Sequence, residues 1–243
     1  MFYNTFLAVI YDPLYNTLVF LVDTVPYGDV GIAIIILTII VKTLLFPITK
    51  KATETQLALK HIAPKLEELK TTHKDNQQNQ VKHMLALYKE HRINPLMSVV
   101  TIFIQLPIII GLYRVFLYGG LPVINPDILY AFVSVPAVIN MQFLGFLDLG
   151  ARSVSLAIIA GLTQFIIAHF SFEAPVTSNK PGASLKDDIM RSMHLQMKYV
   201  LPIIVGAFAY YLAAAVALHW AVGNMYTIIQ DSLVRRRFRA IKA

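Results

Sequence analysis

The sequence predicts an all-α polytopic membrane protein with five transmembrane helices, a cytoplasmic helical hairpin and an N-terminal interfacial helix. Three observations support this fold class. The 243-residue chain is 56% hydrophobic and only 14% charged, whereas soluble domains carry about a quarter charged residues. Its apolar residues gather in blocks close to the roughly 17–25 residues that cross a bilayer as a helix. Its Lys and Arg residues are concentrated in some of the connecting segments and missing from others.

The apolar blocks define the predicted spans. The first covers residues 30–49, the second 96–118 and the third 154–172, and the fourth and fifth together occupy 199–233. The last two blocks are almost continuous, so we expect a tight turn around Ala213 to Val216. Residues 119–153 are expected to form an exterior loop. Its apolar stretch 129–147 contains Pro136 and Asn140, which predicts that it lies along the membrane rather than across it.

The first 29 residues are predicted to form an exterior interfacial segment. Leu14, Leu18, Leu21 and Val25 recur at helical spacing, but the segment also contains polar residues such as Asp12 and Asn16. An amphipathic helix of this kind lies in the membrane interface. The segment has no Lys or Arg, so it lacks the basic region of a signal peptide. The alternative is a degenerate first span.

Basic residues orient the predicted spans. Residues 1–30 and 119–151 contain no Lys or Arg, whereas the segments 50–95 and 173–198 and the tail 234–243 are rich in them. Positive residues flank spans mainly on the cytoplasmic side, which predicts an exterior N-terminus and a cytoplasmic C-terminus. The basic segments are expected to touch anionic lipids. For the Arg-rich tail, contact with a polyanion such as ribosomal RNA is a second possibility.

Residues 50–95 are predicted to form the cytoplasmic helical hairpin. In the first arm, Leu59, Ile62, Leu66 and Leu69 share one helical face, and Pro64 is expected to kink that helix. The expected apolar face of the second arm consists of Val81, Met84, Leu85 and Tyr88. The polar run 75–79 lies between the arms and is expected to turn the chain.

Lys42 is the residue that points to function, because it is an ionisable group inside the first predicted span. Such a group costs about 2.5–3.5 kcal/mol on insertion scales and usually faces a bundle interior or a wet cavity. The alternative is that its long side chain reaches the headgroups. Polar side chains on several predicted spans favour the cavity: Thr38 and Thr49; Ser98, Thr101 and Gln105; Thr163 and Gln164; and Trp220, Asn224, Thr227 and Asp231. We therefore expect a hydrated cavity open to the cytoplasm, where the cation attracts acidic groups of a passing polypeptide.

The sequence argues against an enzyme and against a bound cofactor or metal. There is no cysteine and no nucleotide-binding phosphate loop. The seven histidines show no metal-ligand spacing, and no motif marks a hydrolase. Any transport of a polypeptide would be driven by the transfer of that polypeptide's own apolar residues into lipid or by the membrane potential.

A series of short motifs carries a family resemblance. They are Gly31–Lys50, Pro64-Lys65, Leu87–Lys89, Asn94–Leu96, Ile104–Pro107, Gly111–Tyr113, Leu201-Pro202, Trp220–Asn224 and Ile229-Gln230. In this order and spacing, from about Asp12 to Arg237, the chain resembles the YidC/Oxa/Alb family of membrane insertases, in a minimal bacterial form.

The resemblance implies a hydrophilic groove, open to the cytoplasm and to lipid, that moves nascent membrane proteins into a bacterial inner membrane. It implies action alone or beside the Sec translocon, often with the ribosome. The family's groove arginine corresponds to Lys42, its groove glutamine to Gln164 and its last-span aromatic to Trp220. With Thr38, Gln105 and Asn224 from the polar stripes, these are the expected client-binding residues.

The chain departs from the family pattern in three respects. Lysine in place of arginine keeps the charge but loses the planar fork that binds carboxylates through two bonds. The usual Pro-x-Gly-Leu turn before the last span is replaced by the run from Ala213 to Leu218. The large periplasmic domain of some members and the lipobox cysteine of others are absent from this sequence.

Two other functions compete with an insertase. A small transporter or channel for an anionic solute would place Lys42 in the permeation path, although the sequence shows no inverted repeat. A ribosome tether would use only the basic hairpin and tail, so the polar residues of the spans would be dispensable.

Overall fold

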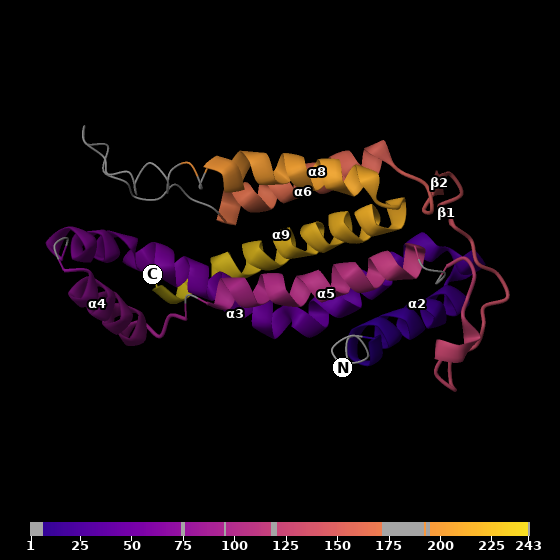
Figure 1. Cartoon of the computed structure of the whole chain (residues 1–243), viewed down its shortest axis with the longest axis horizontal. Helices are drawn as coiled ribbons and strands as arrows, with labels where there is room; N and C mark the ends of the chain where they lie inside the picture. Colours follow the sequence, from indigo (N-terminus) through magenta and orange to yellow (C-terminus); the bar gives the residue numbers. More distant parts are fainter. Residues whose placement is uncertain are drawn as a thin grey trace.

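The computed structural model describes residues 7–73, 76–94, 96–117, 121–171, 192 and 195–242. These residues are mostly helical, which agrees with the predicted all-α class (Figure 1). The principal helices are α2 (Asp12–Thr24), α3 (Val30–Thr72), α4 (Gln77–Glu90), α5 (Met97–Leu117), α6 (Val154–Ser171), α8 (Leu201–Tyr211) and α9 (Ala214–Lys242). Most of the predicted loop 173–198, including Met190 and Met193, lies outside the described residues.

Helix α9 occupies the middle of the bundle, with α3 and α5 on one side and α6 and α8 on the other (Figure 1). All of these helices run along the long axis of the molecule. We call the end that carries α4 the hairpin end, and the end that carries residues 121–153 the loop end. The basic segment 50–95 and the basic end of α9 both lie toward the hairpin end, as the charge pattern requires.

Helix α3 is one continuous helix of 43 residues, so the predicted first span and the first hairpin arm are not separate elements. It is the one helix in the described part of the chain that is long and apolar enough to cross a membrane, over Val30–Leu69. The helix continues through Pro47 and Pro64. Asp29 caps its start by accepting hydrogen bonds from the backbone N–H groups of Gly31 at 2.8 Å and Ile32 at 3.1 Å.

The N-terminal segment packs against the bundle as well as presenting an amphipathic face. A π-helical turn, η1 (Leu7–Tyr11), leads into α2. The predicted apolar face of α2 is buried against α3 and α5, with Leu18 fully covered and Leu14 8% exposed. Asn16 is also buried. Its amide is satisfied there, because it donates to the carbonyl of Ile128 at 2.9 Å and accepts from the N–H of Tyr130 at 2.6 Å.

Residues 121–153 contain no α-helix; they hold a single 3-10 turn, η3 (Pro126–Ile128), and a hairpin of β1 (Gln142–Phe143) with β2 (Leu147–Asp148) in antiparallel register. The stretch 129–147 therefore forms no helical span in this structure. Backbone bonds tie this stretch to the rest of the bundle, for example from Asn140 N–H to the Gly28 carbonyl at 2.9 Å. Gly28 has φ +61°, and an added Cβ would collide with the Val138 carbonyl, so glycine is required there.

The turn between α8 and α9 lies at Leu212–Ala213, slightly before the predicted position. The loop end holds the start of α9 in place: the N–H of Ala214 donates to Ala151 at 2.8 Å, and the N–H of Ala215 donates to Leu149 at 3.0 Å. Carbonyls of a distant segment thus satisfy the free N–H groups that every helix start presents. This explains how the turn forms without the Pro-x-Gly-Leu pattern.

Helices α6 and α8 approach each other closely through two glycines. A Cβ on Gly161 would lie 3.3 Å from the Gly206 Cα, and one on Gly206 would lie 3.4 Å from the Ala157 carbonyl oxygen. Small residues allow helix backbones to pack tightly in membranes, where lipid supplies no hydrophobic drive for association.

The hairpin end has a small core of its own, formed where α4 folds back on α3. Ile62 and Leu87 are buried, and the other predicted first-arm residues, Leu59, Leu66 and Leu69, pack around them. The predicted second-arm face is wrong in part. Tyr88 packs on this core, and burial raises the pKa of its phenol. By contrast, Val81 and Leu85 are 48% and 58% exposed, because the arm is rotated so that Leu87 points inward.

Candidate functional site in the seam between α3 and α9

Helices α3 and α9 run in parallel and meet along a line of polar side chains. We call this line the α3–α9 seam. It consists of Thr38, Lys42, Thr49 and Thr53 from α3 and His219, Gly223, Thr227, Gln230 and Asp231 from α9. The α3 members recur at intervals of four and seven, which places them on one helical face. The seam therefore follows from the spacing of polar residues in both helices.

Lys42 lies where the seam meets α5. Its ammonium donates to Oε1 of Gln105 at 3.3 Å and to Oγ1 of Thr227 at 3.4 Å. Both partners are neutral, and among the described residues no carboxylate forms an ion pair with this ammonium. Gly223 gives the lysine side chain its space, because a Cβ there would stand 3.1 Å from Cε of Lys42. The site thus holds a half-buried cation whose hydrogen-bond partners are neutral polar groups.

Thr38 and His219 form a buried pair one turn from Lys42, toward the loop end. The Thr38 hydroxyl donates to the carbonyl of Ile34 at 2.6 Å and lies 2.8 Å from Nδ1 of His219. Because the threonine proton is already engaged, its oxygen accepts from a protonated Nδ1, and the imidazole tautomer follows from that bond. His219 Nε2 is then an acceptor, and it is buried without a partner in the described residues.

Toward the hairpin end, the seam continues through two threonine bonds. Thr49 donates to Oε1 of Gln230 at 3.0 Å, and Thr53 donates to Oδ1 of Asp231 at 2.7 Å. Asp231 is four residues beyond Thr227, or about 6 Å along the helix. An anion therefore lies one turn away from the partner of Lys42, on the hairpin side.

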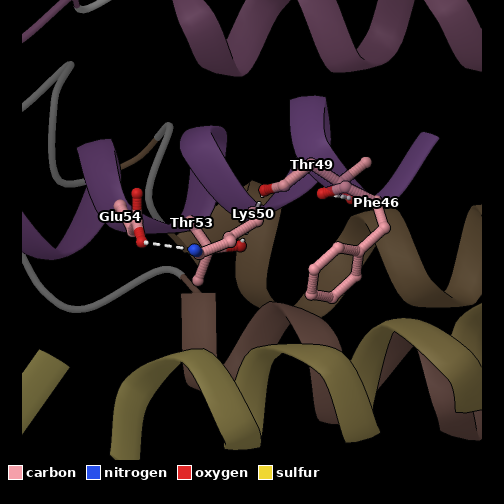
Figure 2. A network of polar contacts seen from close by, with 5 residues as sticks. All are labelled: Phe46, Thr49, Lys50, Thr53 and Glu54. Carbon is pink, nitrogen blue, oxygen red and sulfur yellow. Dashed lines mark hydrogen bonds and ion pairs between the residues drawn. The ribbon is translucent and has the colours of Figure 1, made fainter. Parts of the chain in front are cut away.

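Figure 2 shows the part of α3 that follows Lys42. Thr49 bonds back to the Phe46 carbonyl at 3.2 Å, and Lys50 pairs with Glu54 at 3.7 Å. The Lys50–Glu54 side chains are 41% and 43% exposed, so this ion pair contributes little to stability. Lys50 thus differs from Lys42 in having a carboxylate partner.

The predicted site residues do not all converge. Thr38, Lys42 and Gln105 lie together as expected, but Asn224 turns to the other face of α9. There its amide donates to Thr163 Oγ1 at 3.2 Å and to the Ala160 carbonyl at 3.4 Å. The polar stripe predicted on the fifth span is thus divided between α3 and α6, because a central helix has neighbours on two sides.

Gln164 and Trp220 are both half-buried. Trp220 packs against the main apolar core. Neither is among the hydrogen-bond partners of Lys42 in the described residues. For the predicted second-span residues Ser98 and Thr101, the side chains lie outside the described set.

Four seam residues were missed by the sequence reasoning: Thr53, His219, Gly223 and Gln230. The partner of His219, Thr38, is 181 residues away along the chain. A signal was available, because His219 and Gly223 precede Thr227 by eight and four residues and thus share its helical face. Among the described residues, no cluster of three or more His, Asp or Glu side chains could hold a metal ion.

Fold and site together define a helical protein built around a helix that can cross a membrane, with a half-buried cation held between its helices by neutral partners. The chain belongs to the family described as 60Kd inner membrane protein, whose sequence pattern matches residues 21–241. This confirms the resemblance seen in the motifs. The family is one of non-enzymatic membrane insertases.

Named relatives agree with this assignment. The chain is 30% identical to "Membrane protein insertase YidC" of Oceanobacillus iheyensis over 217 residues, covering 87% of this chain and 77% of the relative. It is 28% identical to the protein of the same name from Shewanella pealeana over 222 residues, covering 91% of this chain but 36% of that protein. It is 27% identical to "Membrane protein insertase YidC 1" of Listeria monocytogenes over 218 residues, covering 87% of this chain and 66% of that protein.

Proposed function

We propose that this chain is a membrane protein insertase in which Lys42 attracts acidic groups of a client polypeptide into a hydrated groove beside α3, α5 and α9. The observation that carries the proposal is the pairing of a half-buried ammonium with two neutral partners, Gln105 and Thr227. The names of the relatives support insertion as the activity.

The proposed step is an exchange of hydrogen bonds. A client carboxylate replaces Gln105 or Thr227 as a partner of the ammonium, and a charge-assisted hydrogen bond is stronger than a neutral one. Partial burial strengthens the attraction, because the effective dielectric constant is lower than in water. The client's apolar segment then transfers into lipid, and the favourable hydrophobic transfer drives the reaction. Because lysine lacks the planar fork, the binding is a general electrostatic attraction.

The remaining parts of the proposal concern surroundings and partners. We place the chain in a bacterial inner membrane with five spans, its N-terminus outside and its C-terminus inside. The basic hairpin and the Arg-rich tail then face the cytoplasm, where they can meet anionic lipids, the ribosome and the Sec translocon. Gln164, Trp220 and Asn224 are proposed as further client contacts in a wider open state of the groove.

The test replaces a host's depleted insertase with variants of this chain and measures insertion of a small client with an acidic translocated segment. Lys42→Arg should retain activity, and Lys42→Met should lose about tenfold or more, as expected for a charged hydrogen bond worth about 1.5–3 kcal/mol. Lys50→Met is the matched control, since Lys50 lies on the same helix and pairs with Glu54. Equal activity of all variants would contradict the role of the Lys42 charge.

The same variants separate the competing functions. A transporter for anionic solutes would give solute flux in liposomes that depends on Lys42 and needs no client. A ribosome tether would keep full activity when Lys42, Gln164 and Trp220 are replaced by alanine, and would lose it when basic residues of the tail are removed.

A further inference from the structure

A cavity lies on the opposite side of the bundle from Lys42, between α6 and α8. It has a volume of about 610 Å³ and is lined almost entirely by apolar and aromatic side chains together with Gly161 and Gly206. Neither Lys42 nor any other predicted client-binding residue lines it. Ile158, Leu162 and Ile203, which do line it, are 56%, 59% and 71% exposed. The cavity therefore faces outward from the bundle, toward the lipid in the proposed arrangement.

The cavity has the length of one membrane leaflet. Along α6 its lining begins at Val154, the first residue of the helix, and ends at Phe165. Eleven residues of helix rise about 16 Å, and half of a hydrocarbon core is about 15 Å. Helix α6 continues to Ser171 without lining the cavity further. Along α6 the cavity thus starts at the loop end and stops six residues before the end of the helix, and on its other side the lining runs from Tyr211 to Tyr199.

A single arginine stands at the loop end of this cavity. The guanidinium of Arg152 lies 5.6 Å from the ring centre of Tyr211, which itself lines the cavity. Arg152 is exposed, and the preceding residues 119–151 contain no other Lys or Arg. A cation at the mouth of an apolar slot matches the two parts of an anionic phospholipid, a charged headgroup and an acyl chain.

We propose that this cavity binds an acyl chain of an anionic phospholipid from the exterior leaflet, with Arg152 holding the headgroup phosphate. The site rests on the proposed orientation of the spans but not on the proposed action of Lys42. The volume suits an acyl chain, since small-molecule sites measure about 300–1,000 Å³.

Native mass spectrometry of the purified full chain tests the site. The protein is mixed with equal amounts of phosphatidylglycerol and phosphatidylcholine, which differ in net charge. The wild type should retain one lipid, with a preference of about fivefold for phosphatidylglycerol, the size expected for one arginine near an anionic headgroup. Arg152→Ala should retain a lipid without this preference.

Two pairs of variants make the test specific. Ala207→Trp fills the cavity and should lose the retained lipid, whereas Ile204→Trp, on the same helix but outside the cavity lining, should keep it. Lys198 lies over Tyr199 at the other end of the cavity. Lys198→Ala should leave the preference for phosphatidylglycerol unchanged. If Lys198→Ala rather than Arg152→Ala abolished the preference, the lipid would belong to the cytoplasmic leaflet and the proposal would be wrong.

Three other results would overturn the proposal as well: a wild type that retains no lipid, an Ala207→Trp protein that binds as the wild type does, or a dimer occupying the site in place of lipid. The readout is independent of client insertion. An inactive Lys42→Met protein should therefore still retain its lipid, so that failure of the lipid site and failure of the insertase proposal remain distinguishable.

Discussion

Gly223 of α9 faces the side chain of Lys42 of α3, so closely that a Cβ at position 223 would lie 3.1 Å from Cε of the lysine. The same Cβ would lie 3.8 Å from the lysine Nζ. Glycine at this position leaves room for the lysine stem beside Gln105 and Thr227. The placement of the cation therefore depends on a residue without a side chain.

Replacing Gly223 with valine should expel Lys42 from the seam. The added methyl groups occupy the space of the lysine stem, so client insertion should fall about as far as in Lys42→Met, by roughly tenfold. The helix itself should tolerate the change, because glycine is already one of the poorest helix formers. The measurement is client insertion in the depleted host. Met225→Val, at an exposed position two residues on, is the control, and full activity of Gly223→Val would refute the packing argument.

Thr38 and His219 should be energetically coupled. Thr38→Val leaves His219 Nδ1–H buried without an acceptor, which should cost about 1–3 kcal/mol. Replacing both residues, with Thr38→Val and His219→Phe, removes the unpaired donor and should cost less than the sum of the two single changes. Thermal unfolding of the purified chain in detergent measures all four proteins. Strictly additive effects would show that the hydrogen bond between these residues contributes nothing.

The hairpin core should depend on Ile62. Ile62→Ala removes the most buried side chain of this small cluster and should destabilise the packing of α4 by about 2–4 kcal/mol. Hydrogen exchange of the α4 backbone should then accelerate, while exchange in α9 stays unchanged. Leu85→Ala is the matched control, because Leu85 belongs to the same hairpin but is 58% exposed. Equal acceleration in both variants would mean that the two arms are not held by this core.

The helical class and most helix positions followed from the sequence because apolar blocks and polar runs are local signals. The predicted second span at 96–118 and third span at 154–172 lie within one residue of α5 and α6 at each end. The last turn was placed late because nothing local marks it: the bonds from Ala214 and Ala215 reach residues of the loop end. The predicted first span and first hairpin arm form one continuous helix, α3, which runs through Pro47 without a break at residue 50.

Local sequence signals predicted less of the candidate site than of the fold. An ionisable residue in an apolar block identified Lys42, and helical spacing identified Thr38 as a neighbour. Spacing on one helix could not show which neighbour each face of α9 meets, so Asn224 was grouped with Thr227 although it bonds to Thr163. The spacing of Gly223 places it on the same helical face as Thr227, but only the contact across the seam reveals its role.

A charge-exchange experiment tests the central claim most directly. A client with a single Asp in its translocated segment is compared with the same client carrying Lys there, and each is inserted by wild type and by Lys42→Glu. We predict that Lys42→Glu fails with the Asp client, by tenfold or more, and regains most activity with the Lys client, because the attraction is restored with reversed signs. Insertion by Lys42→Glu that is the same for both clients would contradict a direct electrostatic contact between residue 42 and the client.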